Sequence, residues 1–363
     1  MISKRFKTTL LPLCVALVSV CGAPGATAQA FGSQTETKEP TTAPALLTLP
    51  QMPLHDPWIV ADRATRVYYL YTSNVASITG VPSIGTMLYT SRNLHDWTRP
   101  KVVFRIPRGI WANAGGWAPE VHAYRGRYWL FTTLHNETAK LPPSRSGRTT
   151  YRRGTVLAVS DRLEGPFRLV RSGEPVAPPS LMTLDGTLYV DRSGMPWLVY
   201  AHEWIQRSIG TMEAMPLTRN LAAKGRPVHL FSATDASWPA GQAQVSPSEL
   251  VYVTDGPELF RTHSGTLLML WSSWAKDGYT QSIARSRSGG IKGPWDQLDP
   301  LVHRDSGHGM LFKAFDGTLM LVLHRPFKNA RGKLYQMRDA GDRVEIVRER
   351  TDLDGDDPEK ANP

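Results

Sequence analysis

The sequence repeats one pattern five times, and this repeat limits the fold more than any other feature of the chain. Each unit opens with a polar, usually acidic residue and continues as a short, largely apolar run that ends at a turn. The five segments are HDPWIVAD, APEVHAY, LDGTLYVD, DGPELFRT and HGMLFKAF. Their leading residues are 53 to 70 residues apart, which leaves room for four short strands in every unit.

Four-stranded sheets repeated around an axis form a β-propeller. We therefore predict an all-β fold, a five-bladed β-propeller with four antiparallel strands per blade, over residues 51–350. Because the innermost strands all begin at the same end of the central channel, the leading residues should meet on one face. These residues are Asp56, Glu120, Asp185, Asp255 and His308. Carboxylates this close together raise each other's pKa, as a general acid that works near neutral pH requires.

The first 30 residues are typical of a secretory signal peptide. They combine a basic start, a short apolar run and the sequence Ala28-Gln29-Ala30, after which we expect cleavage. Both cysteines, Cys14 and Cys21, lie in this segment, so the exported chain would contain no disulfide. A lipoprotein anchor at Cys21 is disfavoured because Val20, before it, is not small. The sequence predicts an exported protein, periplasmic or extracellular.

The remaining composition describes a soluble globular chain. It is 41% hydrophobic and 20% charged, and it has no second apolar stretch of membrane length. The net charge of +10 comes from scattered basic residues, so we expect no nucleic-acid and no membrane partner, and a monomer. The Thr- and Pro-rich residues 31–50 predict a linker, and residues 351–363 an acidic, disordered tail.

The order and spacing of five short motifs resemble those of glycoside hydrolase family 43. The motifs are His55-Asp56-Pro57, Trp117-Ala118-Pro119-Glu120, Leu184-Asp185-Gly186, Thr254-Asp255-Gly256-Pro257 and Gly307-His308-Gly309. Members of that family are five-bladed propellers that hydrolyse arabinosides, xylosides or galactosides with inversion. The resemblance implies a general base at Asp56, a residue that tunes the acid's pKa at Asp185, and a channel histidine at His308. It implies no required cofactor and assigns no metal ligand, but it is compatible with a structural calcium ion near His308.

The general acid is where the chain departs from this family. The usual Glu-Gly-Pro of the fourth blade is replaced by Asp255-Gly256-Pro257, and Glu258 follows. Glu203, at the end of the strand that returns beside Asp185, is an ionisable residue before a tryptophan, and we predict that it is the acid, with Asp255 as the alternative. Strand alternation would put Glu258 on the opposite face from Asp255, which disfavours it.

The resemblance predicts a secreted enzyme that acts on plant-type polysaccharides or oligosaccharides, with exo action or release of side chains as the leading hypothesis. The predicted substrate-binding residues are Glu120, Trp117, Asp255, His308 and Arg325. Arg325 could instead form an ion pair with a funnel carboxylate. The absence of Glu-Gly-Pro leaves a non-catalytic carbohydrate-binding propeller as the alternative, and His55 in place of asparagine disfavours a fructosidase. The sugar, the linkage and endo or exo action depend on loops such as 136–153.

Overall fold

A computed structural model describes residues 46–144, 146–246 and 249–354. The predicted signal peptide, most of the predicted linker and most of the predicted tail lie outside these residues. The described chain forms five four-stranded antiparallel sheets and one additional two-stranded sheet. None of its helices is long and apolar enough to cross a bilayer. The predicted five-bladed β-propeller is confirmed.

Every blade is built from four consecutive strands. Blade 1 contains β1 (Trp58–Asp62), β2 (Val67–Ser73), β3 (Gly85–Ser91) and β4 (Lys101–Arg105). Blade 2 contains β5 (Ala114–Tyr124), β6 (Arg127–Leu141), β7 (Thr150–Ser160) and β8 (Arg168–Leu169). Blade 3 contains β9 (Thr183–Val190), β10 (Pro196–His202), β11 (Thr211–Pro216) and β12 (Val228–Ser232). Blade 4 contains β15 (Asp255–Arg261), β16 (Leu267–Ala275), β17 (Gly278–Ser286) and β18 (Trp295–Gln297), and blade 5 contains β19 (Gly307–Lys313), β20 (Leu319–Arg325), β21 (Arg331–Asp339) and β22 (Val344–Glu349).

The other elements are short. Hairpin β13 (Gln242–Ser246) and β14 (Glu249–Val251) lies between blades 3 and 4 in the chain. The helices are η1 (Leu49–Gln51), α1 (Ala76–Thr79), η2 (Arg171–Gly173), α2 (Trp204–Arg207), η3 (Ala233–Asp235) and α3 (Thr351–Asp354). The first of these, η1, includes the last residues of the predicted linker. The last, α3, begins the predicted tail, where the buried Asp354 forms an ion pair with Lys333 at 2.6 Å. Residues 351–354 therefore belong to the folded part, not to a disordered tail.

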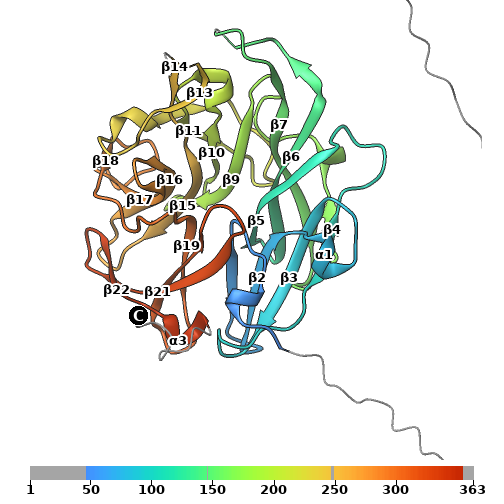
Figure 1. Ribbon diagram of the computed structural model, residues 1–363, viewed down its shortest axis with the longest axis vertical. Coiled ribbons are helices and arrows are strands. Elements are labelled where there is room, and N and C mark those ends of the chain that lie inside the picture. The colour runs from blue at the N-terminus through green and yellow to red at the C-terminus, as the bar shows by residue number, and fades with distance from the viewer. Residues whose placement is uncertain (1–45, 145, 247–248, 355–363) are drawn as a thin grey trace, which may run out of the picture. The chain divides into compact units, whose positions relative to one another are not determined.

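The blades are arranged around a central channel. Figure 1 shows β5, β9, β15 and β19 around the middle of the molecule, with β4, β18 and β22 toward its rim. Within each blade, the inner strands of the sheet pack against the neighbouring blades on both faces. The second strand of blade 3, β10, is therefore buried at every position. Burial on both faces explains why these strands form continuous apolar runs in the sequence.

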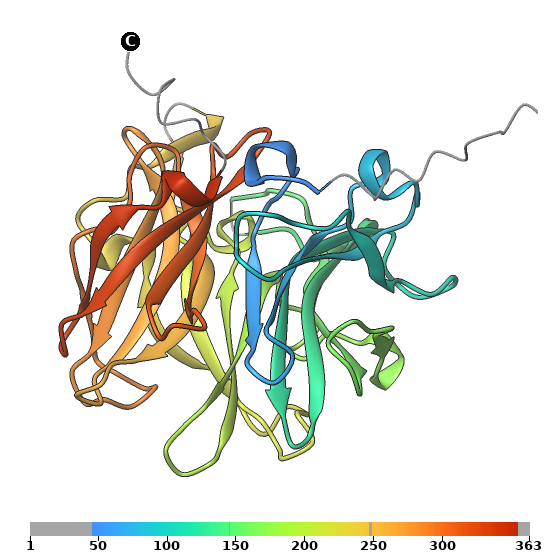
Figure 2. The ribbon, with the colours of Figure 1, turned by 90° about the horizontal axis from the view of Figure 1, so that it is seen from below.

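The ring closes by packing rather than by a shared strand. Figure 2 shows the last blade, in red, beside the first segment of the described chain, in blue. The N–H group of Leu54 donates a hydrogen bond to the carbonyl of Ala330 at 3.1 Å. Leu54 and Leu49 lie so close to Gly332 of β21 that a Cβ on this glycine would be 2.5 Å from Leu54. The apolar start of the domain thus holds blades 1 and 5 together.

A β-bulge recurs where the innermost strands of blades 2 to 5 begin. In each of these blades, a three-residue advance along the innermost strand pairs with a two-residue advance along its partner strand. The bulges lie within residues 117–120, 184–187, 255–258 and 307–310. The second residue of each bulge has positive φ: Ala118 (43°), Asp185 (55°), Gly256 (56°) and His308 (51°), and Asp56 (48°) takes this conformation just before β1. Such backbone strain in residues other than glycine occurs mostly at functional sites. The bulge shifts the alternation that follows it and therefore decides which side chains face the channel.

Candidate active site

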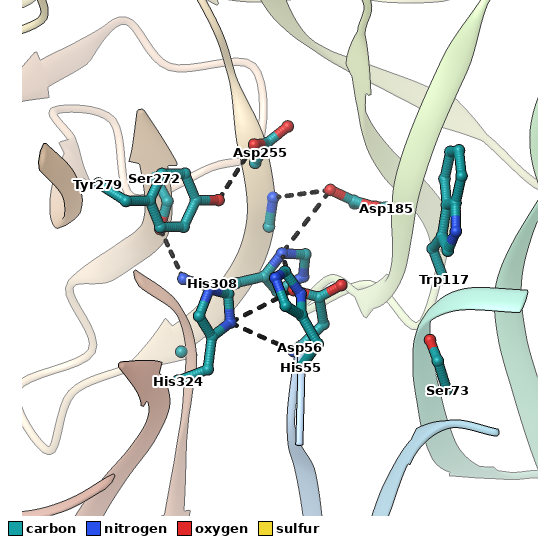
Figure 3. A network of polar contacts seen from close by, with 12 residues as sticks. His55, Asp56, Ser73, Trp117, Asp185, Asp255, Ser272, Tyr279, His308 and His324 are labelled. Atoms are coloured by element: carbon teal, nitrogen blue, oxygen red, sulfur yellow. Dashed lines mark hydrogen bonds and ion pairs between the residues drawn. The ribbon is translucent and has the colours of Figure 1, made fainter. Parts of the chain in front are cut away.

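A cavity of about 390 Å³ opens where the bulged ends of the innermost strands meet. It is lined by His55, Asp56, Ser73, Trp117, Leu184, Asp185, Asp255, Tyr279, His308 and Phe327. Figure 3 shows its polar network, with Tyr279 and Trp117 on opposite sides. All five blades contribute to the lining. The predicted convergence is therefore confirmed for three of the carboxyl groups and the channel histidine, and Trp117 joins them.

Asp56 is surrounded by imidazoles. Its Oδ1 atom lies 2.8 Å from Nδ1 of His55, 3.1 Å from Nδ1 of His308 and 3.4 Å from Nδ1 of His324. Burial would raise the pKa of Asp56, but the charges of His308 and His55 and the hydrogen bond from His55 outweigh it and hold the pKa well below its usual range. Asp56 is therefore an ionised carboxylate, the form that a general base requires.

Asp185 is held in the opposite protonation state. Its own N–H group donates to Oγ1 of Thr133 at 2.9 Å, and the N–H group of Gly256 donates to its Oδ2 at 3.3 Å. Burial raises the pKa of Asp185 well above its usual range, and the charges of Asp255 and Asp56 raise it further. Asp185 therefore keeps its proton at a pH where Asp56 is ionised.

Asp255 lies across the cavity and has an intermediate pKa. The hydroxyl of Tyr279 donates a hydrogen bond to its Oδ2 at 3.0 Å. Burial and the charge of Glu203 raise the pKa of Asp255 to about 7. A cavity-lining carboxyl group with a pKa near neutrality suits a general acid.

Glu203 does not line the cavity. It is the residue before α2, it is 4% exposed, and its carboxylate forms an ion pair with Arg153 of β7. Burial raises the pKa of Glu203, although Arg153 acts in the opposite direction. The predicted acid is thus absent from the cavity lining, although its charge raises the pKa of Asp255, and the alternative candidate takes the cavity position.

Glu120 and Glu258 lie one layer deeper, in the channel. The bulges place both of them beside Trp58 and Met310, around a small cavity of about 10 Å³. The prediction that Glu120 leads its blade is wrong, because Ala118 takes the position that Asp56 and His308 take in theirs. Glu258 was expected on the opposite face of its strand from Asp255, but the bulge between these residues shifts the alternation and brings Glu258 to the channel cavity.

Arg325 contacts neither the cavity nor a funnel carboxylate, contrary to both predictions. Its guanidinium donates to Oε1 of Glu349 at 2.5 Å and to the hydroxyl of Tyr335 at 2.9 Å.

Trp117 is in contact with one residue from each of the next two strands of its blade. Arg153 lies 4.8 Å from the centre of its ring and His135 stacks on it at 5.7 Å. The supported indole is a platform for a flat, apolar sugar face.

Three further residues of the site, His55, His324 and Tyr279, were not predicted to belong to it. His55 and His324 each belong to a short motif, HDP and LHRP, that could have pointed to them. Tyr279 follows the hairpin turn between β16 and β17, and its ring is parallel to that of His324, 5.6 Å away. No sequence signal separates Tyr279 from the other tyrosines, because its contact is with Asp255 of β15, two strands away in the same blade.

The channel below His308 fits a hard cation such as calcium. Calcium takes oxygen ligands, and carboxylates from Glu120 and Glu258 face the small channel cavity. Oε2 of Glu258 is buried without a hydrogen-bond partner among the described residues. Burial and the facing Glu120 raise the pKa of Glu258 to about 8, so in the absence of a cation this carboxyl group keeps a proton.

Fold and site together define a class of protein: a five-bladed propeller whose channel opens into a cavity where the pKa of Asp56 is lowered and the pKa values of Asp185 and Asp255 are raised. The chain belongs to glycosyl hydrolases family 43, whose model matches residues 50–343. It is therefore a glycoside hydrolase. This family is the one that the five motifs had indicated.

Known relatives agree with this assignment. An endo-arabinase from Bacteroides thetaiotaomicron VPI-5482 is 32% identical, with a TM-score of 0.71 over 80% of this chain and 96% of that one. The extracellular endo-alpha-(1->5)-L-arabinanase 1 of Bacillus subtilis (strain 168) is 24% identical over 160 residues, which is 42% of this chain and 44% of that enzyme. An endo-1,4-beta-xylanase from Bacteroides thetaiotaomicron VPI-5482 shares the fold, with 20% identity and a TM-score of 0.62 over 82% of this chain and 95% of that one.

Proposed function

We propose that the protein is an exported arabinan-degrading glycosidase that cleaves α-1,5-linked arabinofuranosyl chains with inversion. The observation that carries this proposal is that Asp56, Asp185 and Asp255 line one cavity, where the pKa of Asp56 is lowered and that of Asp255 is raised to about 7. The arabinan substrate is supported by the names of two relatives, both of which are endo-acting arabinanases. These relatives favour endo action over the exo action that the sequence suggested.

In the proposed mechanism, Asp56 and Asp255 act on opposite sides of the anomeric carbon. Asp56 takes a proton from a water molecule, whose oxygen attacks the anomeric carbon. Asp255 gives its proton to the glycosidic oxygen, and the bond from this oxygen to the anomeric carbon breaks. Inversion needs the two carboxyl groups roughly 6.5–9.5 Å apart, so that the water fits between base and sugar.

Asp185 and Glu203 support the acid and the base in this scheme. The protonated Asp185 accepts the N–H group of Gly256, the residue after Asp255, and so fixes the backbone on which the acid stands. Glu203 forms an ion pair with Arg153, and its charge adds to burial in keeping the pKa of Asp255 high. The assignment of Asp255 as the acid replaces the prediction of Glu203, because only Asp255 lines the cavity.

A substrate panel tests the proposal. The purified protein is assayed on linear 1,5-arabinan, arabino-oligosaccharides, xylan and galactan, with chain length followed by chromatography and the anomeric product by NMR immediately after cleavage. We expect internal cleavage of linear arabinan, release of the inverted anomer, and loss of activity in Asp56→Asn. A protein that binds arabinan without cleaving it would instead be the carbohydrate-binding propeller.

A channel cation and the export of the chain are further parts of the proposal. A calcium ion would be held by Glu120 and Glu258 and would supply positive charge below the active site, while the residues of the cavity carry out the reaction. Dialysis against EDTA should then lower the melting temperature of the wild type but not of Glu258→Gln. Export predicts that protein recovered outside the cytoplasm of its host begins at Phe31, which N-terminal sequencing measures.

A further inference from the structure

Asp56 is surrounded by three imidazoles, which is more than its proposed role as a general base requires. Three Nδ1 atoms, from the segment before β1, from β19 and from β20, lie 2.8 to 3.4 Å from a single carboxylate oxygen. Figure 3 shows His55, His308 and His324 gathered around Asp56. His55 and His308 are enough to keep a general base ionised, and His324 is a third imidazole within reach of the same oxygen.

His324 presents a lone pair to this cluster. It is completely buried, and its Nδ1 atom accepts a hydrogen bond from the N–H group of Asp56 at 3.3 Å. An acceptor nitrogen carries no proton, so the proton of this neutral imidazole is on Nε2, which has no partner among the described residues. The nitrogen that faces Asp56 is thus in the form that binds a metal ion.

The spacing of the donor atoms suits a tetrahedral metal ion. Donor atoms from His55, Asp56 and His324 all lie within 4.8 Å of one another. Zinc bonds of roughly 2.0–2.2 Å at tetrahedral angles place neighbouring donor atoms about 3.3 Å apart. Distances of 2.8 and 3.4 Å from Asp56 to the two imidazoles are close to this value, and His308 at 3.1 Å is within reach as a fourth ligand.

The surroundings favour a cation, and the site is open to solvent. The cavity lining contains three carboxyl groups and, within the described residues, no lysine or arginine. The side chain of His55 is 37% exposed, so an ion can reach the cluster through the mouth of the cavity. A mixture of imidazole nitrogens with one carboxylate oxygen selects zinc, copper or nickel over calcium and magnesium, which prefer oxygen ligands.

We propose that His55, Asp56 and His324 form an inhibitory site for a divalent transition metal, with Zn²⁺ as its ligand and His308 available to complete the coordination. A metal ion bound here occupies the carboxylate that must accept a proton from water, so binding stops hydrolysis reversibly. The effect on catalysis rests on the proposed role of Asp56 as base, whereas metal binding itself does not. The site differs in its ligands from the channel cavity, which adds the carboxyl groups of Glu120 and Glu258, although Asp56 and His308 border both cavities.

The test measures binding and inhibition separately on the full chain. Protein freed of metal with EDTA is titrated with Zn²⁺ by calorimetry and with Co²⁺ by visible absorption, in which tetrahedral nitrogen and oxygen coordination gives intense bands. We expect one ion per chain, inhibition of arabinan hydrolysis at the same Zn²⁺ concentration as binding, and recovery with EDTA. Addition of Ca²⁺ should not displace the bound ion, and displacement by Ca²⁺ would overturn the assignment of nitrogen ligands.

Two matched histidine variants make the test specific. His55→Gln removes a half-exposed ligand and should weaken Zn²⁺ binding by at least about tenfold, with the Co²⁺ bands reduced or lost. His263→Gln removes an exposed histidine that pairs with Asp339 at 2.9 Å in the same Nδ1 to Oδ1 contact, and it should bind Zn²⁺ like the wild type. Equal affinity in His55→Gln and the wild type, or loss of binding in His263→Gln, would overturn the proposal. If the protein failed to cleave arabinan but these binding results held, the metal site would stand and the proposed function would fall.

Discussion

The hydroxyl of Tyr279, on β17, donates a hydrogen bond at 3.0 Å to Oδ2 of Asp255, on β15 of the same blade. This contact leaves the other carboxyl oxygen of Asp255 to carry the proton toward a leaving group. It also stabilises the ionised form of Asp255, whereas the charge of Glu203 opposes ionisation. Two neighbours thus act on the same proton in opposite directions.

Tyr279→Phe and Glu203→Gln should therefore shift the pH profile in opposite directions. A general acid is active below its pKa, so activity should fall as the pH rises through about 7, the pKa of Asp255. Loss of the Tyr279 hydroxyl removes a contact that lowers this pKa, and the alkaline limb should move to higher pH. Loss of the Glu203 charge should move it to lower pH. The measurement is kcat/KM between pH 4 and 9, and shifts in the same direction would contradict the assignment.

Asp255→Asn should lose activity according to the leaving group. On arabinan, which needs protonation of the departing oxygen, we expect a loss of about 10²–10⁴-fold. On an aryl arabinoside with a dinitrophenolate leaving group, most of the activity should remain, whereas Asp56→Asn should be inactive on both substrates. Glu203→Gln is the matched control and should show no dependence on the leaving group at its own optimum. If Glu203→Gln shows that dependence instead, Glu203 is the acid, as the sequence first suggested.

Gly256→Ala should disturb the site through His308. Gly256 has a φ of 56°, and a Cβ atom on it would lie 2.8 Å from the ring of His308. The clash should displace His308 and the N–H group that contacts Asp185, so we expect kcat to fall at least about tenfold. Gly194→Ala is the control, because its φ of 79° imposes similar backbone strain but its Cβ would meet no atom within 4 Å. Equal kcat values for the two variants would contradict this prediction, because they would mean that His308 can move away from the new Cβ atom without loss of activity.

Arg148→Met should loosen the long β6–β7 hairpin. The guanidinium of Arg148 is buried and donates to Oε1 of Glu249 at 2.5 Å, to the carbonyl of Ile205 at 3.0 Å and to Oγ of Ser208 at 2.7 Å. Removing one partner leaves the others unpaired, and we expect a loss of about 2–4 kcal/mol in the free energy of unfolding. Arg127→Met, which removes an exposed ion pair with Asp161, should cost less than about 1 kcal/mol. Denaturant unfolding and hydrogen exchange in residues 136–153 measure both effects, and equal losses would contradict the role of Arg148.

The sequence by itself determined the blades. Strand alternation and turn residues act over a few positions, so hairpins such as that around Arg192–Gly194 could be found without the structure. The recurrence of these hairpins then fixed their number and the end of the channel at which Asp56, Asp185, Asp255 and His308 meet. Repetition makes this possible, because each unit confirms the boundaries of the others.

Only the tertiary structure decided what each of these residues does. The register shift between Asp255 and Glu258 depends on pairing with β16, and no local sequence pattern encodes it. For this reason the sequence placed Glu120 in the wrong layer of the channel and Glu258 on the wrong face of its strand. The ion pair of Glu203 with Arg153 joins two blades. Two of the three imidazoles around Asp56, those of His308 and His324, come from the last blade, whereas Asp56 precedes the first. Protonation states follow from burial and from neighbours across the channel, and these exist only once the ring of blades has closed.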